Sequence, residues 1–318
     1  MRITNNMMIT NMMQNLNKNM LRMDKKQMQV STGKRIHVPS DDPVAISRSL
    51  KIRADLSELD QYRKNVDDSV SFLETTDLAV KNVGEALQRL RELTVQASNG
   101  VLTGEDTKKI AGEVKEIKEQ IINLGNTTYS GKYIFSGKKT DEKLFIFDTD
   151  PAVNDYVYNV GLTNNIDPNV IDDKIQFEVG VNEKIEINSL GFEIFDLPPS
   201  TSATAGDKPG IIAMINGILT DLDTGNSAGL SAAIANVDSY INVNLTARSD
   251  IGAKMNRMEL VQNRIADDKI NYSKLRSQLE DADMGEVIMQ LMKEENVYRA
   301  SLSVGARVIQ PTLLDFLR

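Results

Sequence analysis

The 318-residue sequence contains no cysteine, no tryptophan and only one histidine, His37. The absence of cysteine excludes disulfides, thiolate metal sites and cysteine nucleophiles. Histidine chemistry normally needs a partner residue, and His37 stands in an expected loop beside Pro39. Asp41 and Asp42 form a carboxylate pair, but Asp42 suits the N-cap of a helix that begins at Pro43. We therefore expect no catalytic, cofactor or metal site, and no enzyme.

A net positive charge and long apolar runs are also absent. The net charge is −8, which argues against bulk binding of nucleic acid. No stretch approaches the 18 or so apolar residues that a transmembrane helix needs. The first twenty residues, MRITNNMMITNMMQNLNKNM, have no continuous apolar segment and no small-residue cleavage site. We expect neither a membrane segment nor a cleaved signal peptide.

Aromatic residues are few, and their positions divide the chain. Ten of the sixteen Phe and Tyr residues lie between Tyr129 and Phe195, and five of the eight prolines lie between Pro151 and Pro209. Short alternating runs typical of strands occur in the same region, at 144–147, 156–158, 175–179 and 184–187. The sequence predicts a mainly α, α+β fold in which an outer β domain, 138–210, is inserted into a helical chain. Because the helical pattern stops and restarts outside this insert, we expect the insert to be dispensable for the helical core.

The helical part shows apolar residues at every seventh position. One series is Ile52, Leu59, Val66, Leu73, Val80 and Leu87, and another is Ile251, Met258, Ile265, Tyr272 and Leu279. Such heptads predict a long antiparallel, coiled-coil-like helical rod, which we assign to 41–137 plus 211–282. Asn99 and Gly100 would end the first long helix, and Thr103 to Asp106 would cap the next one. Ser69 lies off the strict seam, so an aspartate there should be tolerated.

Both ends of the chain carry narrow apolar stripes at helical spacing. The candidate assembly interface consists of Ile9, Met13, Leu16, Met20, Met23, Ile288, Leu291, Tyr298, Leu302 and Ile309. Neither stripe is wide enough to fold alone, so each needs a partner helix. Residues 1–36 carry a charge of +6 and residues 280–295 a charge of −5, which favours pairing of the two ends. We predict an inner coiled coil, 1–40 plus 283–318, whose helices are disordered in the free monomer.

Five sequence segments, in order, resemble the bacterial flagellin superfamily over about 1–137 and 240–318. They are STGKRI (31–36) with PSDDP (39–43), LRELTVQASNG (90–100), RSDIGA (248–253), LEDADM (279–284) and LLDFL (313–317). The opening Met1-Arg-Ile-Thr, the two prolines of PSDDP, YIFSG (133–137) and the LLDFL tail are similar to the FlgL-type hook-associated proteins. Filament flagellins usually lack that proline pair and that tail.

The resemblance implies a structural adaptor between flagellar hook and filament, located outside the cell. The protein would be exported by the flagellar type III pathway without signal cleavage. Its partners would be copies of itself in a ring, the other hook-associated junction protein, flagellin and an export chaperone. Two alternatives stay open, a filament-forming flagellin and a cytoplasmic coiled-coil scaffold. Self-polymerisation would favour the first, and stable discrete dimers in dilute solution would favour the second.

Overall fold

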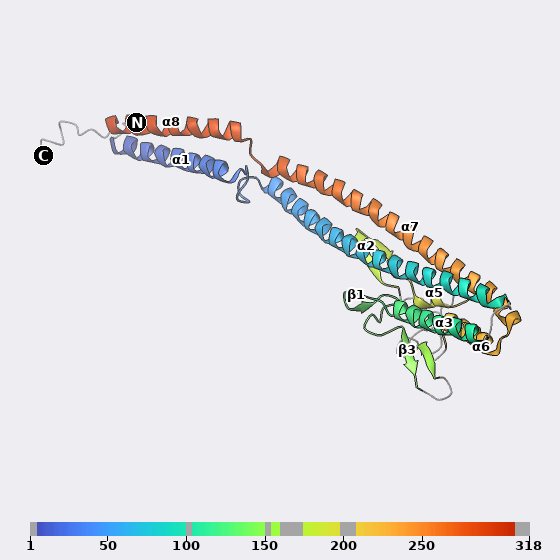
Figure 1. Cartoon of the computed structure of the whole chain (residues 1–318). Helices are drawn as coiled ribbons and strands as arrows, with labels where there is room; N and C mark the ends of the chain where they lie inside the picture. Colours follow the sequence, from blue (N-terminus) through green and yellow to red (C-terminus); the bar gives the residue numbers. More distant parts are fainter. Residues whose placement is uncertain (1–4, 100–103, 150–153, 160–173, 198–207, 309–318) are drawn as a thin grey trace. The chain divides into compact units, whose positions relative to one another are not determined.

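The computed structural model describes residues 5–99, 104–149, 154–159, 174–197 and 208–308 (Figure 1). The helices are α1 (Asn5–Thr32), α2 (Pro43–Ser98), α3 (Gly104–Gly125), α5 (Gly191–Phe195), α6 (Gly210–Thr224), α7 (Ser227–Glu280) and α8 (Met284–Val308). The strands are β1 (Thr128–Tyr129), β2 (Lys132–Tyr133), β3 (Phe145–Asp148), β4 (Asp155–Tyr158), β5 (Gln176–Gly180) and β6 (Glu183–Glu186). The mainly α, α+β fold is confirmed. The chain forms two compact units, one of residues 1–59 and 267–318 and the other of residues 60–266.

The expected helix ends are largely confirmed. Asp42 caps α2, because its Oδ1 accepts a hydrogen bond from the amide of Ala45 at 3.0 Å. The helix ends at Ser98, just before the expected stop, whereas Thr103 lies outside the described residues. Gly225 ends α6 in the left-handed region, at φ 69°, which lets the chain turn directly into α7.

The core of the second unit confirms the heptads of α2 and α7. Val66, Leu73, Val80 and Leu87 are at most 1% exposed, and Ile251, Met258 and Ile265 are buried opposite them. The expectation for Ser69 is wrong, because its side chain is 0% exposed. A second buried line runs through Tyr62, Ser69, Thr76, Val83, Leu90 and Ala97. The hydroxyls of Ser69 and Thr76 donate to the carbonyl oxygens of Asn65 and Phe72 at 2.6 and 2.8 Å, which hides them inside an apolar seam.

The four expected strands are confirmed as β3 to β6, which form two antiparallel hairpins, β3–β4 and β5–β6. The sequence did not predict the β1–β2 hairpin or the short helix α5. Ser130 and Gly131 connect β1 to β2 with positive φ angles of 51° and 79°, which are typical of a tight hairpin turn. The hairpin β5–β6 is held to α7 by Glu183, which accepts bonds from Arg264 at 2.6 Å and Arg257 at 3.3 Å.

The described part of the 138–210 segment shares one core with the surrounding helices. Phe195 packs edge-on against Phe135 and Phe145, with ring centroids 5.8 and 5.2 Å apart. Asp155, at the start of β4, accepts bonds from Lys118 of α3 at 2.5 Å and from Asn216 of α6. Both contacts lie within the unit of residues 60–266. The three-part division into inner, helical and outer domains therefore stays a prediction about the assembled protein.

Candidate functional site

The two terminal helices, α1 and α8, lie side by side and antiparallel within the first unit (Figure 1). This pairing of the two ends confirms the prediction from the heptads and charges. Gly305 approaches Met12 so closely that a Cβ atom built on the glycine would lie 2.4 Å from the methionine Cε. Further along the same seam, Asn19 Nδ2 donates to Ser301 Oγ at 2.9 Å. The seam thus brings together residues almost 300 positions apart.

The seam contains some of the predicted interface residues and excludes others. Five predicted residues are half-buried, namely Ile9, Leu16 and Met23 of α1 and Leu291 and Tyr298 of α8. Four predicted residues are exposed instead, namely Met13, Met20, Ile288 and Leu302. Ile309 lies outside the described residues. The role of the whole set in assembly remains a prediction.

The residues that sequence reasoning missed are a polar layer in the middle of this seam. Asn19 is buried and bonds to Ser301, and Arg22 forms an ion pair with Glu294 at 3.6 Å. Arg22 also donates to Asn19, which joins the two contacts into one network. A polar residue at a core position of a coiled coil fixes register at a cost in stability. The sequence did contain a sign of this layer. Val287, Glu294 and Ser301 lie seven residues apart, which places them on one face of α8.

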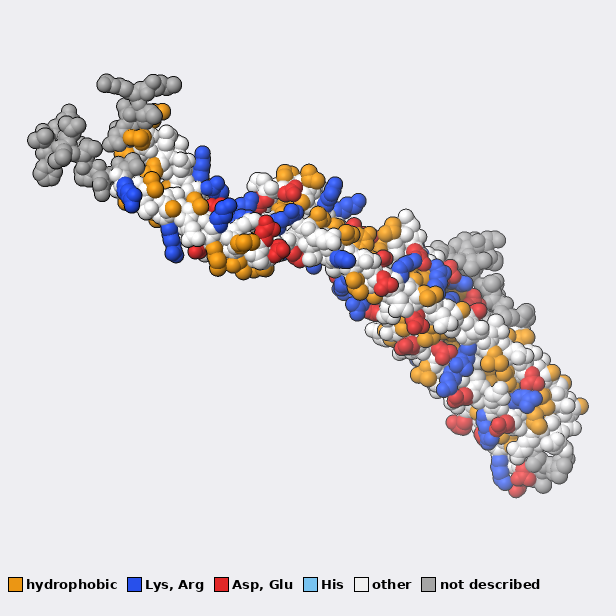
Figure 2. All heavy atoms as spheres, turned by 90° about the horizontal axis from the view of Figure 1, so that it is seen from above, with side chains coloured by type: hydrophobic (Ala, Val, Ile, Leu, Met, Phe, Trp, Pro, Cys, Tyr) orange, Lys and Arg blue, Asp and Glu red, His pale blue; other side chains and the backbone are white. Residues whose placement is uncertain are grey.

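Large apolar side chains stand exposed along both terminal helices. Six lie on α1 (Met7, Met8, Met13, Met20, Leu21, Met28) and seven on α8 (Met284, Ile288, Met289, Met292, Val297, Leu302, Val304). More than half of the exposed large apolar side chains of the described chain belong to these two helices. Figure 2 shows apolar side chains among charged ones on this surface. A groove between the helices, lined by Met8, Met12, Leu16, Val297 and Val304 among others, leaves about 580 Å³ unfilled.

A buried carboxylate fixes the place where the terminal helices join the long ones. Glu280, 5% exposed, accepts two hydrogen bonds from Arg53, both at 2.7 Å, and one from Ser49. The ammonium of Lys34 lies 3.3 Å from the same carboxylate. The hydrogen bonds from Arg53 lower the pKa of Glu280 to about 2, although burial acts in the opposite direction. We call Glu280, Arg53, Lys34 and Ser49 the Glu280 cluster.

Backbone hydrogen bonds extend the Glu280 cluster across the two chain segments. The amide of Arg35 donates to the carbonyl oxygen of Glu280 at 2.6 Å, and the amide of Ala282 donates to that of Gly33 at 2.9 Å. The segment after α1 is therefore tied directly to the segment between α7 and α8. All these residues belong to the unit of residues 1–59 and 267–318.

The other polar candidates from the sequence have structural contacts. Asp41 accepts a bond from Lys25 at 2.7 Å, which lowers its pKa to about 2, and its second oxygen accepts the amides of His37 and Val38. The ring of His37 lies 3.1 Å from the hydroxyl of Thr32. Asp41 therefore holds the loop before α2, and Asp42 caps the helix.

Within the described ranges, no group of three or more His, Cys, Asp or Glu side chains is arranged to hold a metal ion. Over the same residues, no helix is both long enough and apolar enough to span a membrane.

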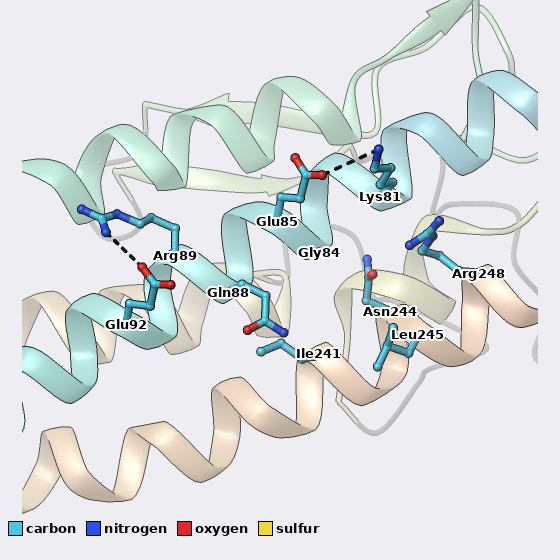
Figure 3. Close-up of a pocket in the computed structure, with 10 residues that line it drawn as sticks. All are labelled: Lys81, Gly84, Glu85, Gln88, Arg89, Glu92, Ile241, Asn244, Leu245 and Arg248. Atoms are coloured by element: carbon cyan, nitrogen blue, oxygen red, sulfur yellow. Dashed lines mark hydrogen bonds and ion pairs between the residues drawn. The ribbon is translucent and has the colours of Figure 1, made fainter.

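A groove between α2 and α7 of the second unit is shown in Figure 3. Its floor includes Asn244, which donates to the carbonyl oxygen of Val80 at 2.9 Å, and Gly84, where a Cβ would lie 2.7 Å from the Asn244 Oδ1. Charged side chains at the rim are paired, Lys81 with Glu85 at 3.8 Å and Arg89 with Glu92 at 3.0 Å. Gly84 has no side chain, so α7 can come close to α2 at Asn244. We therefore interpret this groove as a feature of helix packing.

The chain is similar to several flagellar proteins. Models of the N-terminal and C-terminal helical regions of bacterial flagellin match residues 3–140 and 234–317. The flagellar hook-associated protein 3 of Escherichia coli (strain K12) is 26% identical over 316 residues, which covers 95% of both chains. A flagellin of Bacillus subtilis (strain 168) is 26% identical over 335 residues and covers 100% of both chains. The solved structure of a flagellar hook-associated protein from Vibrio parahaemolyticus matches with a TM-score of 0.64 at 21% identity, covering 76% of this chain and 100% of that one.

Proposed function

The chain belongs to the bacterial flagellin family, and we propose that it is the structural adaptor that joins the flagellar hook to the filament. Its matches include both a hook-associated protein and a flagellin at the same identity, so identity alone does not separate the two roles. The paired prolines of 39–43, YIFSG at 133–137 and the LLDFL tail favour the junction role.

The observation that carries the proposal is the terminal hairpin of α1 and α8. Its internal seam includes the polar residues Asn19, Ser301 and Glu294, while many of its large apolar side chains face outward. A soluble monomer rarely exposes so many large apolar residues on two helices, and such surfaces mark interaction sites. The hairpin therefore presents the kind of surface that neighbouring subunits of a tubular assembly would cover.

The proposal includes partners and a location. Copies of this chain would form a ring, with the other hook-associated junction protein on one side and flagellin on the other. An export chaperone would bind the chain before its passage through the flagellar type III pathway to the outside of the cell. The function is structural and involves no catalysis. The two alternatives are a filament-forming flagellin and a cytoplasmic coiled-coil scaffold.

The test is the addition of purified full-length protein to isolated hooks, observed by electron microscopy. We expect a short layer at the hook end that does not grow with time or concentration. Long polymers formed by the protein alone, when seeded, would favour the filament role. Absence of any addition, together with stable discrete dimers in dilute solution, would favour the cytoplasmic scaffold.

A matched pair of variants connects this test to the hairpin. Leu21→Asp places a charge on an exposed apolar position of α1, and Asn17→Asp places the same charge on an exposed polar position one turn away. Leu21→Asp should abolish addition to hooks, whereas Asn17→Asp should retain most of it. Equal addition by the two variants would show that the apolar surface of α1 is not used.

A further inference from the structure

The methionines are distributed very unevenly in exposure. Eight of them stand exposed in the described chain, and all eight lie on the terminal helices, namely Met7, Met8, Met13, Met20, Met28, Met284, Met289 and Met292. By contrast, Met258 in the seam of α7 is 0% exposed. Met12, which lies against Gly305 of α8, and Met23 are half-buried. Exposed thioether sulfur is therefore concentrated on the two helices that the proposed function assigns to assembly.

The chain has few other side chains that an oxidant would attack. Thiolates are oxidised more readily than thioethers, but the chain has no cysteine. It has no tryptophan either, and its single histidine is His37. An oxidant that reaches the free protein will therefore react mainly with methionine sulfur, and first with the exposed residues.

We propose that the exposed methionines of α1 and α8 are a modification site for hydroperoxides, and that their oxidation prevents assembly of the free subunit; this second part rests on the proposed function. A sulfur lone pair attacks one peroxide oxygen, an S–O bond forms and the O–O bond breaks. The sulfur loses two electrons and becomes a sulfoxide, while the departing hydroxide takes the proton of the transferred oxygen and leaves as water.

The chemical change is opposite to what an assembly surface needs. A thioether is flexible and apolar, and packs against differently shaped neighbours, whereas a sulfoxide is polar and chiral. Burying sulfoxides between subunits would leave acceptor oxygens without hydrogen-bond donors. Subunits that are already assembled should resist oxidation, because their methionines are then covered.

The experiment treats the full chain with hydrogen peroxide and measures two quantities. Peptide mapping by mass spectrometry should find sulfoxide at the eight exposed methionines before any appears at Met258. Addition to isolated hooks should fall by about tenfold or more at the same protein concentration, which corresponds to ~1.4 kcal/mol per subunit added. Treatment with methionine sulfoxide reductases should restore addition. Oxidation at Met258 as fast as at the helix positions would overturn the assigned site.

A variant with leucine at the eight exposed positions is the matched control, since leucine is similar in size and resists peroxide. Its addition to hooks is measured first without peroxide, and whatever that level is, peroxide treatment should not lower it. If oxidised wild-type protein with mapped sulfoxides still joins hooks, or if the leucine variant loses addition as strongly as wild type, the proposal is refuted. Failure of untreated wild-type protein to join hooks is a separate result, which refutes the proposed function and leaves the mapping to decide the site of oxidation.

Discussion

Replacing Glu280 by glutamine should loosen the junction between the terminal and long helices. The substitution keeps the shape of the side chain but removes the charge that Arg53 and Lys34 share. The lowering of the Glu280 pKa from 4.5 to about 2 corresponds to about 3 kcal/mol of favourable interaction with the ionised form. The side chains of Arg53 and Lys34 are 47% and 44% exposed, so water will solvate them once the carboxylate is gone. We therefore expect a smaller net loss of ~2 kcal/mol.

Hydrogen exchange is the appropriate assay, because the loss is local. The amides of Arg35 and Ala282 donate across the junction, so their protection reports its opening. A loss of ~2 kcal/mol should make both amides exchange about 30-fold faster. Glu259→Gln, at an exposed position of α7, removes the same charge and should leave them unchanged. Equal protection in Glu280→Gln and wild type would refute the reasoning.

The same carboxylate predicts a pH dependence. Because the pKa of Glu280 is lower in the folded state than its ordinary 4.5, its contribution is fully present above about pH 5. The contribution is lost as the pH falls toward 2, where the folded-state carboxylate takes up a proton. Protection of the Arg35 amide, corrected for intrinsic exchange rates, should fall over this range in wild type. Glu280→Gln should show a much smaller fall there.

Three further predictions concern the helices. Leu73→Asp, at a fully buried position of α2, should lower the free energy of unfolding by ~3 kcal/mol or more. Leu78→Asp, where the leucine is 56% exposed, should change the thermal midpoint little. Equal midpoints would contradict the assignment of Leu73 to the buried seam. In α3, Gly125→Ala should destabilise the protein by about 1–3 kcal/mol, because its Cβ would lie 2.2 Å from the Phe145 ring. The Cβ of Gly112→Ala would meet open space, so this variant should stabilise the helix by about 0.5–1 kcal/mol. Denaturant unfolding measures both changes. Limited proteolysis of dilute monomer should remove the terminal helices and leave a core unable to join hooks, whereas strong exchange protection of those helices would show that they fold without partners.

The sequence was sufficient for the long helices because their heptads are regular. Pro43 and Asp42 mark the start of α2, and buried residues at every seventh position confirm its face. Ser69 escaped this reasoning, because a pattern of apolar and polar residues assigns serine to the surface. In a helix a serine hydroxyl can bond to the carbonyl four residues earlier, and Ser69 does so with Asn65. Small hydroxyl residues at heptad positions are therefore compatible with a core.

The composition of the sequence revealed the inserted segment, but it did not reveal that this segment packs against the helices. The rings of Phe145 and Phe195 belong to the 138–210 segment, and they pack against each other and against Phe135 and Gly125 outside it. A chain that joins Gly137 directly to Gly210 would uncover those apolar contacts. These contacts argue against a dispensable insert, and retention or loss of helical circular dichroism in that deletion would decide the question. Local periodicity gave no sign of them, because a contact between distant segments leaves no mark in it.

The terminal hairpin was predicted as a pair, but part of the apolar stripe expected in its seam is exposed, for a physical reason. Sequence reasoning chose the most apolar positions, including Met13 and Met20, for the internal contact. The hairpin instead places Asn19 inside and leaves both methionines exposed. This hairpin leaves apolar side chains in contact with solvent and buries an amide, so its seam contributes little stability. That contribution has to offset the conformational entropy lost when two helices become ordered. The same arrangement would become favourable if neighbouring subunits covered the methionines. We therefore predict that folding of the ends is coupled to assembly.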